Sequence, residues 1–290
     1  MKTFNEIWFK IVKFFSNPKC VFWLGFVIAF AATLAETLRG RCENFHVYAD
    51  ATNLFWSGIT PYTQDFVDAH SRYFLYSPVF NVLFTPFALL PWWIGTFAWN
   101  MMNYCLMFLA VWTLPGALRP HRLKIFLFLL SILEQSIFCY QYNVTICYLF
   151  LFAFTLLENK KPFWAVLLIM ISATTKVYGV VELALLFCYP KTLRNFGYAA
   201  LCGAALLLSP MLNIGMEHPL LLYEDMANML TQHNNEVEYV GLLYARGLKS
   251  LLLPNAMMVQ VGVLALLAVG FSLATGSGVA LRSGYRRLPY

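Results

Sequence analysis

Charged residues are scarce in this sequence: they make up 12% of its 290 residues, whereas a typical soluble domain has about a quarter. Hydrophobic residues account for 60% of the chain and aromatic residues for 17%. That is more apolar surface than one aqueous core can bury. The composition excludes an ordinary soluble domain and predicts an integral membrane protein with no room for a separate soluble domain.

The sequence also lacks the motifs of several common sites. It contains no GxGxxG or related phosphate-binding loop, and its seven cysteines show no CxxC or Cys/His spacing. We therefore expect no metal site and no cofactor, and we interpret the cysteines as small core residues. The net charge of +6 does not indicate nucleic-acid binding, because the basic residues form short clusters between apolar runs.

The apolar runs predict an all-α, polytopic integral membrane protein with about eight transmembrane helices and with outer-side juxtamembrane helices. Proline residues break the first half of the run 77–114, so we expect 77–91 to lie along the membrane surface and 93–114 to cross. The run 162–189 is expected to cross twice as two short helices that turn near 172–176. The other expected spans lie near 20–38, 123–140, 144–157, 195–213 and 254–275.

The basic clusters indicate the orientation, because cytoplasmic loops are rich in Lys and Arg. Lys2, Lys10, Lys13 and Lys19 place the N-terminus in the cytoplasm. Residues 1–275 then form a single transmembrane domain, with outer loops at about 39–91 and 214–250, and residues 276–290 form a cytoplasmic tail. The further clusters expected on the cytoplasmic side are Arg119 with Arg122 and Lys124, Lys160 with Lys161, Lys191 with Arg194, and Arg282 with Arg286 and Arg287.

The first outer loop is the richest in chemically active side chains. A carboxylate in this loop, such as Glu43 or Asp50, is suited to take a proton from an acceptor hydroxyl. The alternative interpretation is an ordinary solvated loop. The polar and aromatic residues of this loop include Asn44, His46, Tyr48, Tyr62, Asp65, Asp68, His70 and Arg72.

Lys176 is the sharper signal, because it lies in the middle of an apolar run. A charge at the centre of a membrane helix costs on the order of 2.5 kcal/mol or more, and such a residue usually has a function. At an outer-side turn between two short helices, Lys176 is suited to hold an anionic head group. The alternative is that its side chain extends to the membrane interface.

An ordered set of short motifs resembles glycosyltransferase family 87 over about residues 40–250. No single motif is diagnostic, but their order is fairly specific. The set consists of Asn44-Phe45-His46-Val47-Tyr48, Gly58, Pro61-Tyr62, Tyr76-Ser77-Pro78, Pro86, Leu90-Pro91, Trp99-Asn100, Asn103, Gln141, Asn143, Lys176-Val177-Tyr178-Gly179 and Tyr189-Pro190-Lys191.

The resemblance implies a GT-C-like helical bundle in the bacterial plasma (inner) membrane. Such a protein is expected to transfer a hexose, similar to mannose, from a polyprenyl-phosphate sugar to a lipid or glycan acceptor on the outer face. Its partners would be these substrates and membrane lipids, with no nucleic acid. The family usually continues beyond this chain with more helices.

The resemblance also assigns roles to residues. Lys176 matches the lysine motif of the family and is expected to bind the donor phosphate, with Glu43 and Asp50 as candidate bases. Asn44 stands where many members have Asp, and a neutral amide cannot act as a base. We expect substrate binding by Asn44, Tyr48, His70, Tyr76, Gln141 and Asn143. Two alternatives stay open: a transporter or flippase of lipid-linked sugars, and a non-catalytic family member in cell-envelope assembly.

Overall fold

The computed structural model describes residues 2–236, and every regular element in that range is a helix. The predicted all-α class is confirmed for these residues. The expected span at 254–275 and the tail at 276–290 lie outside them. The helices are α1 (Lys2–Phe15), α2 (Pro18–Leu38), α3 (Glu43–Trp56), α4 (Gln64–His70), α5 (Pro78–Ala88), α6 (Trp92–Thr113), η1 (Gly116–His121), α7 (Arg122–Phe138), α8 (Asn143–Glu158), α9 (Pro162–Thr175), η2 (Val177–Cys188), α10 (Thr192–Leu207), η3 (Ser209–Leu212), η4 (Pro219–Leu221) and α11 (Leu222–Glu236).

Three segments of the described chain are long and apolar enough to cross a membrane: Pro18–Leu38, Trp92–Thr113 and Thr192–Leu212. Several shorter apolar helices accompany them, among them α8, α9 and η2. A helix of about 20 residues is needed for a full crossing of an average bilayer. The apolar character of the bundle is therefore clear, and the count of about eight spans stays a prediction.

Both long apolar runs are divided as the sequence predicted. Run 77–114 becomes α5 and α6, and Pro91 caps the start of α6 where its ring cannot continue a preceding helix. Run 162–189 becomes α9 and η2, which pack closely against each other. The break lies at Lys176, whose backbone is extended (φ −142°, ψ 134°).

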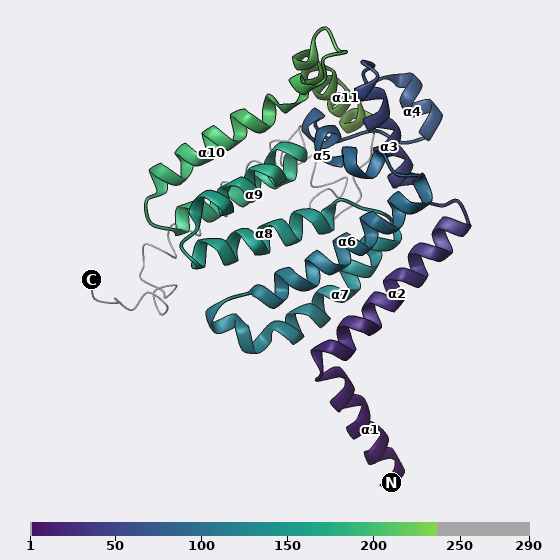
Figure 1. The fold of residues 1–290 in the computed structure, drawn as a ribbon, viewed down its shortest axis with the longest axis vertical. Coiled ribbons are helices and arrows are strands. Elements are labelled where there is room, and N and C mark those ends of the chain that lie inside the picture. Colours follow the sequence, from purple (N-terminus) through teal and green to yellow (C-terminus); the bar gives the residue numbers. More distant parts are fainter. Residues whose placement is uncertain (1, 237–290) are drawn as a thin grey trace, which may run out of the picture.

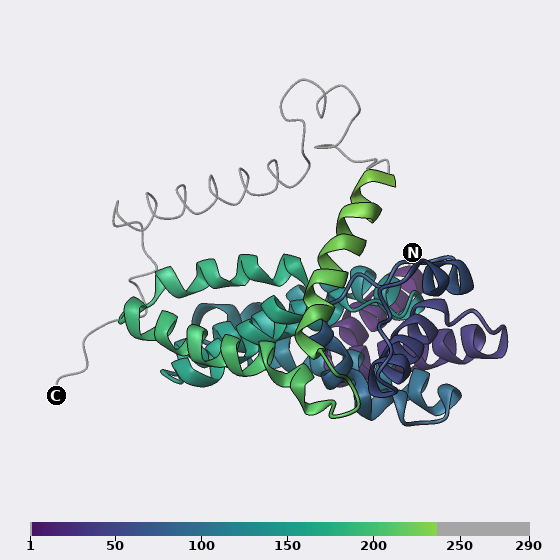
Figure 2. The ribbon, with the colours of Figure 1, turned by 90° about the horizontal axis from the view of Figure 1, so that it is seen from above.

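Successive helices of the bundle alternate in direction, so the connections between them lie at its two ends. Many of the basic residues lie at one of these ends. In Figure 1, α2 and α6 to α10 lie side by side, with α3, α4 and α11 gathered at one end of the bundle. We call this the α3 end, and the opposite end the basic end. Figure 2 shows α11 projecting away from the packed helices. The basic end holds Lys19, Arg119, Arg122, Lys160, Lys161, Lys191 and Arg194, all at helix ends or in the connections between helices.

The predicted outer loop at the α3 end is largely helical. Residues 39–76 form α3, α4 and the segment that leads into α5, and they enclose an aromatic core. The fully buried rings of Phe45, Phe55, Phe74, Phe80 and Phe84 belong to this core. Burial of these large rings stabilises the region, which is therefore a packed part of the fold and not a solvated loop.

Candidate functional site

Lys176 lies at the α3 end of the bundle, between the last residue of α9 and the first of η2. Its ammonium donates a hydrogen bond to Oδ1 of Asn143 at 2.9 Å. The same ammonium lies over the ring of Tyr76, 5.0 Å from the centroid, and 5.7 Å from the ring centroid of Tyr178. These contacts are favourable to a cation but do not neutralise it. Among residues 2–236, no carboxylate forms an ion pair with Lys176.

Backbone contacts fix the position of Lys176 relative to the first loop region. The N–H of Ser77 donates to the carbonyl oxygen of Thr175 at 3.1 Å, and its hydroxyl donates to the carbonyl of Thr174. The hydroxyls of Tyr142 and Thr175 lie 3.0 Å apart. The last carbonyls of a helix have no partner within it. Ser77 therefore satisfies two carbonyls of α9 and joins the start of α5 to the residue before Lys176.

Three tyrosines of the region 39–76 belong to the buried aromatic core. Tyr48, Tyr62 and Tyr76 are all at least nine-tenths buried, and their rings pack against other aromatic side chains. The hydroxyls of Tyr48 and Tyr76 lie 2.8 Å apart, and the hydroxyl of Tyr62 donates to the carbonyl of Tyr76. Burial raises the pKa of Tyr48 to about 12. These phenols are therefore neutral at physiological pH and position the ring beneath Lys176.

Asp50 and His70 form one acid–base pair at the α3 end. Nε2 of His70 lies 3.0 Å from Oδ2 of Asp50, and Nδ1 lies 3.0 Å from the carbonyl oxygen of Phe66. Both neighbours are oxygen acceptors, so the doubly protonated imidazolium satisfies both contacts and a neutral ring satisfies only one. The Asp50 side chain is 50% exposed, which leaves its carboxylate accessible to a substrate hydroxyl.

Glu43 and Arg72 form the second pair. Glu43 and Asp50 are seven residues apart, which places both on the same face of α3. Their partners come from the same short stretch that ends α4 and follows it. An imidazole can exchange a proton near neutral pH, whereas a guanidinium cannot. Asp50 is therefore better suited than Glu43 to acid–base chemistry.

The two groups of candidate residues lie on different faces of α3. Tyr48 and Asp50 are two residues apart, which is roughly 200° around a helix with 3.6 residues per turn. Tyr48 faces the buried ring of Tyr76, and Asp50 faces His70. No hydrogen bond or ion pair within residues 2–236 joins Lys176 directly to Glu43 or Asp50. The structure thus brings the candidates to the same end of the bundle in two separate clusters.

The remaining candidates hold the site in place. The amide of Asn44 donates to the carbonyl of Cys139 at 2.7 Å, which ties α3 to the end of α7. The amide of Asn143 donates to Oε1 of Gln141 at 3.1 Å, and this leaves Oδ1 of Asn143 for Lys176. In the described part of the chain, no three His, Cys, Asp or Glu side chains are grouped as metal ligands are.

Sequence reasoning missed the roles of Ser77, Thr175 and Tyr142. Tyr76-Ser77-Pro78 is one of the motifs that carry the resemblance, and its structural role is the attachment to α9 that Ser77 makes. A signal was available: Ser before Pro is typical of the residue that precedes a helix. The partner of that serine, 97 residues away along the chain, could not be found from local sequence.

The fold and this site define a helical membrane protein that has, among residues 2–236, a cation without a carboxylate partner and two ion pairs at one end of its bundle. A family model described as glycosyltransferase family 87 matches residues 74–289, which is more than half of the chain. The chain belongs to glycosyltransferase family 87. No curated protein and no solved structure matches it. The matched region contains Tyr76, Gln141, Asn143 and Lys176, whereas Glu43, Asp50 and His70 precede it.

Proposed function

We propose that this glycosyltransferase transfers a hexose, similar to mannose, from a polyprenyl-phosphate sugar to a lipid or glycan acceptor on the outer face of the plasma membrane. The proposal rests on the environment of the Lys176 ammonium. Lys176 is partly buried, and its ammonium is held by Asn143 and Tyr76 and has no carboxylate partner among the described residues. A cation held in this way favours a ligand that brings a negative charge.

A lipid phosphate supplies that charge and also explains the apolar surroundings. The isoprenoid tail would lie against the apolar helices of the bundle, and Lys176 would contact the phosphate oxygens. As the bond between the anomeric carbon and the phosphate oxygen breaks, negative charge grows on the phosphate. A fixed cation stabilises this charge more in the transition state than in the bound donor.

Asp50 is our candidate for the base, and this assignment requires the hexose of the bound donor to extend from the Lys176 cluster to the Asp50 cluster on the other face of α3. Its free carboxylate oxygen would accept the proton of the acceptor hydroxyl while that oxygen bonds to the anomeric carbon. The polyprenyl phosphate then leaves with the electron pair of the broken bond. In this proposal His70 is a positioning residue, because its ring orients the carboxylate without contacting the sugar. Gln141 and Asn143 would contact the donor near its phosphate.

The test is transfer from synthetic polyprenyl-phosphate sugars by the purified chain, with a panel of lipid acceptors. We expect Lys176→Ala to lose at least about 100-fold in kcat/KM, a loss typical of removing one group that stabilises developing charge. Lys176→Arg should retain part of the activity, because the charge is kept. Lys160→Ala, at the basic end, is the matched control and should transfer like the unmodified chain.

Two outcomes of this experiment would contradict the proposal. Full activity of Lys176→Ala would show that Lys176 does not bind the donor phosphate. Absence of transfer with every polyprenyl-phosphate sugar, together with activity from a nucleotide sugar, would replace the proposed donor class.

A further inference from the structure

Helix α1 is separated from α2 by a change in the direction of the chain. It ends at Phe15, and Asn17 caps the next helix by accepting a hydrogen bond from the backbone N–H of Lys19. Pro18 then begins α2. A proline at this position starts a new helix and prevents α1 and α2 from forming one continuous helix. Figure 1 shows α1 turning away from α2 at the basic end and not extending the line of the span.

The surface of α1 combines uncovered apolar side chains with lysines. Ile7 is 54% and Phe9 is 68% exposed, and Phe14 and Phe15 are also exposed. Lys10 and Lys13 are spaced so that they share one face of the helix. A helix with these two kinds of surface is typical of one that lies in the membrane interface.

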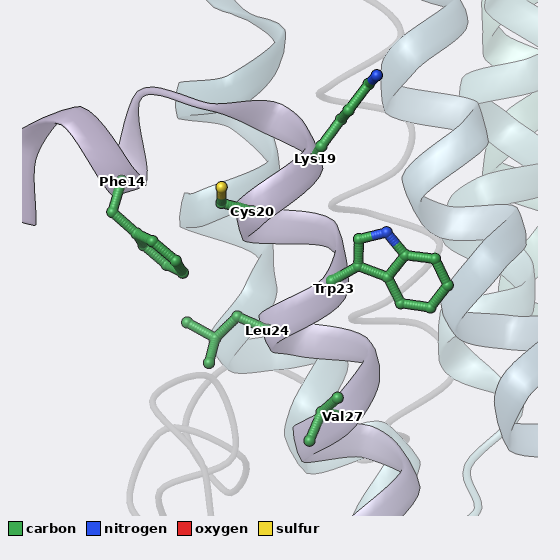
Figure 3. A pocket seen from close by; sticks show the side chains of 6 residues that line it. All are labelled: Phe14, Lys19, Cys20, Trp23, Leu24 and Val27. Atoms are coloured by element: carbon green, nitrogen blue, oxygen red, sulfur yellow. The ribbon is translucent and has the colours of Figure 1, made fainter.

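A shallow groove of about 440 Å³ lies where α1 meets α2. Phe14 comes from α1, and the other walls come from one side of α2 (Figure 3). Along α2, Lys19 stands at one end of the groove and Val27 at the other, more than two helical turns further. Between these ends the groove is lined by Cys20, Trp23 and Leu24.

Basic residues outnumber acidic ones in the two helices around this groove from α1 to Val27. From Ile7 to Val27 the chain has three lysines and no acidic residue, and Glu6, just before this range, is the one acidic residue of α1. Lys10, Lys13 and Lys19 take part in none of the ion pairs among the described residues. Positive charge at one end of an apolar groove matches an amphiphile that has an anionic head and a hydrocarbon chain. A soluble anion would leave the apolar walls uncovered, and a zwitterionic lipid would not use the excess of lysines.

We propose that the α1–α2 groove binds one anionic glycerophospholipid. Lys19 contacts its phosphate, Lys10 and Lys13 on α1 add to the positive charge of this part of the chain, and one acyl chain lies along Trp23, Leu24 and Val27. This site is separate from the α3 end, and its existence does not depend on the proposed transferase reaction.

The test is retention of lipid by the full chain, measured by native mass spectrometry from nanodiscs of equal parts phosphatidylglycerol and phosphatidylcholine. We expect at least about five-fold preference for phosphatidylglycerol in the unmodified chain. A variant with Lys10→Gln, Lys13→Gln and Lys19→Gln should lose this preference. The matched control, Lys160→Gln with Lys161→Gln, removes charge from the same end of the bundle and should keep it.

A second variant tests the hydrocarbon part of the site. Val27→Trp fills the inner end of the groove without changing the charge, and it should lower the retained phosphatidylglycerol by several-fold. Equal retention of both lipids by the unmodified chain would overturn the proposal, as would an unchanged preference in the triple lysine variant. Displacement of the lipid by millimolar glycerol phosphate would show that the head group alone binds, and this would also overturn it. If the triple variant fails to fold, Lys19→Gln alone and Val27→Trp decide the same question.

Discussion

At the scale of single residues, the environment of Lys176 is the clearest link between sequence and function. A neutral tyrosine ring and an amide oxygen hold the ammonium in place, and both leave its charge intact. Replacing either neighbour by a carboxylate would fill the position that we assign to the donor phosphate. The neutral partners of Lys176 therefore support an anionic ligand as much as the lysine itself does.

Asp50 and Glu43 provide a prediction that separates the two candidate bases. Asp50→Asn keeps the shape of the side chain and removes its basicity, so transfer should fall by about 10²-fold or more. Glu43→Gln should change transfer by less than about three-fold, because the partner of Glu43 is the permanently charged guanidinium of Arg72. The measurement is kcat/KM at one pH, with Asp65→Asn on α4 as the control.

The same variants should fold normally, because a partly exposed ion pair contributes only about 0–1 kcal/mol to stability. Thermal unfolding of each variant in detergent checks this point. If Glu43→Gln is the variant that loses transfer and Asp50→Asn is not, the base is Glu43.

The sequence predicted which residue types matter but not which of them face each other. Lys176 was identified because a charge within an apolar run is costly. The pairs of Asp50 with His70 and of Glu43 with Arg72 join residues 20 and 29 positions apart. The sequence did not predict that Tyr48 and Asp50 lie on different faces of α3. The residue at which this helix begins sets which side chains point inward, and a polar stretch does not reveal that residue.

At the scale of elements, the packing of α9 against η2 determines where Lys176 can be. Gly179 lies against α9 so closely that an added Cβ would be 2.3 Å from the backbone carbon and oxygen of Ser172. The hydroxyl of Ser172 also donates to Oε1 of Glu182 at 3.0 Å. Small residues allow helices to approach each other in this way in membrane proteins.

Gly179→Ala should therefore destabilise the hairpin formed by α9 and η2. We expect a loss of about 1–3 kcal/mol, the usual effect of inserting a methyl group where backbone atoms cannot move away. Gly197→Ala on α10 is the matched control, since no atom lies within 4 Å of its added Cβ. The measurement is thermal unfolding in detergent. Equal melting temperatures for the two variants would show that α9 and η2 are not tightly packed.

The breaks between elements were the most predictable part of the fold. Pro91 and the short polar stretch before Lys176 lie where the structure divides the two long apolar runs, whereas Pro86 lies inside α5 and does not interrupt it. Proline and polar residues act locally, which explains why sequence was sufficient here. The helical content of residues 39–76 was harder to predict, because its buried rings contact one another across large distances along the chain.

At the scale of the whole molecule, the sorting of charge between the two ends of the bundle gives a test of orientation. The basic end should face the cytoplasm. In a background without the native cysteines, Asp65→Cys should react with a membrane-impermeant maleimide in intact cells. Lys161→Cys should react only after the cells are permeabilised. The reverse pattern would place the proposed site on the cytoplasmic side and exclude an outer-face reaction.

The two hydrogen bonds from Ser77 to the end of α9 have a mechanical consequence. They connect the segment that carries Tyr76 to the residue next to Lys176, so neither side can move alone without breaking them. A shift of Lys176 on substrate binding would therefore also shift the start of α5 and the aromatic core packed behind it. The hairpin that positions Lys176 and the aromatic core that encloses Tyr76 therefore form one connected unit.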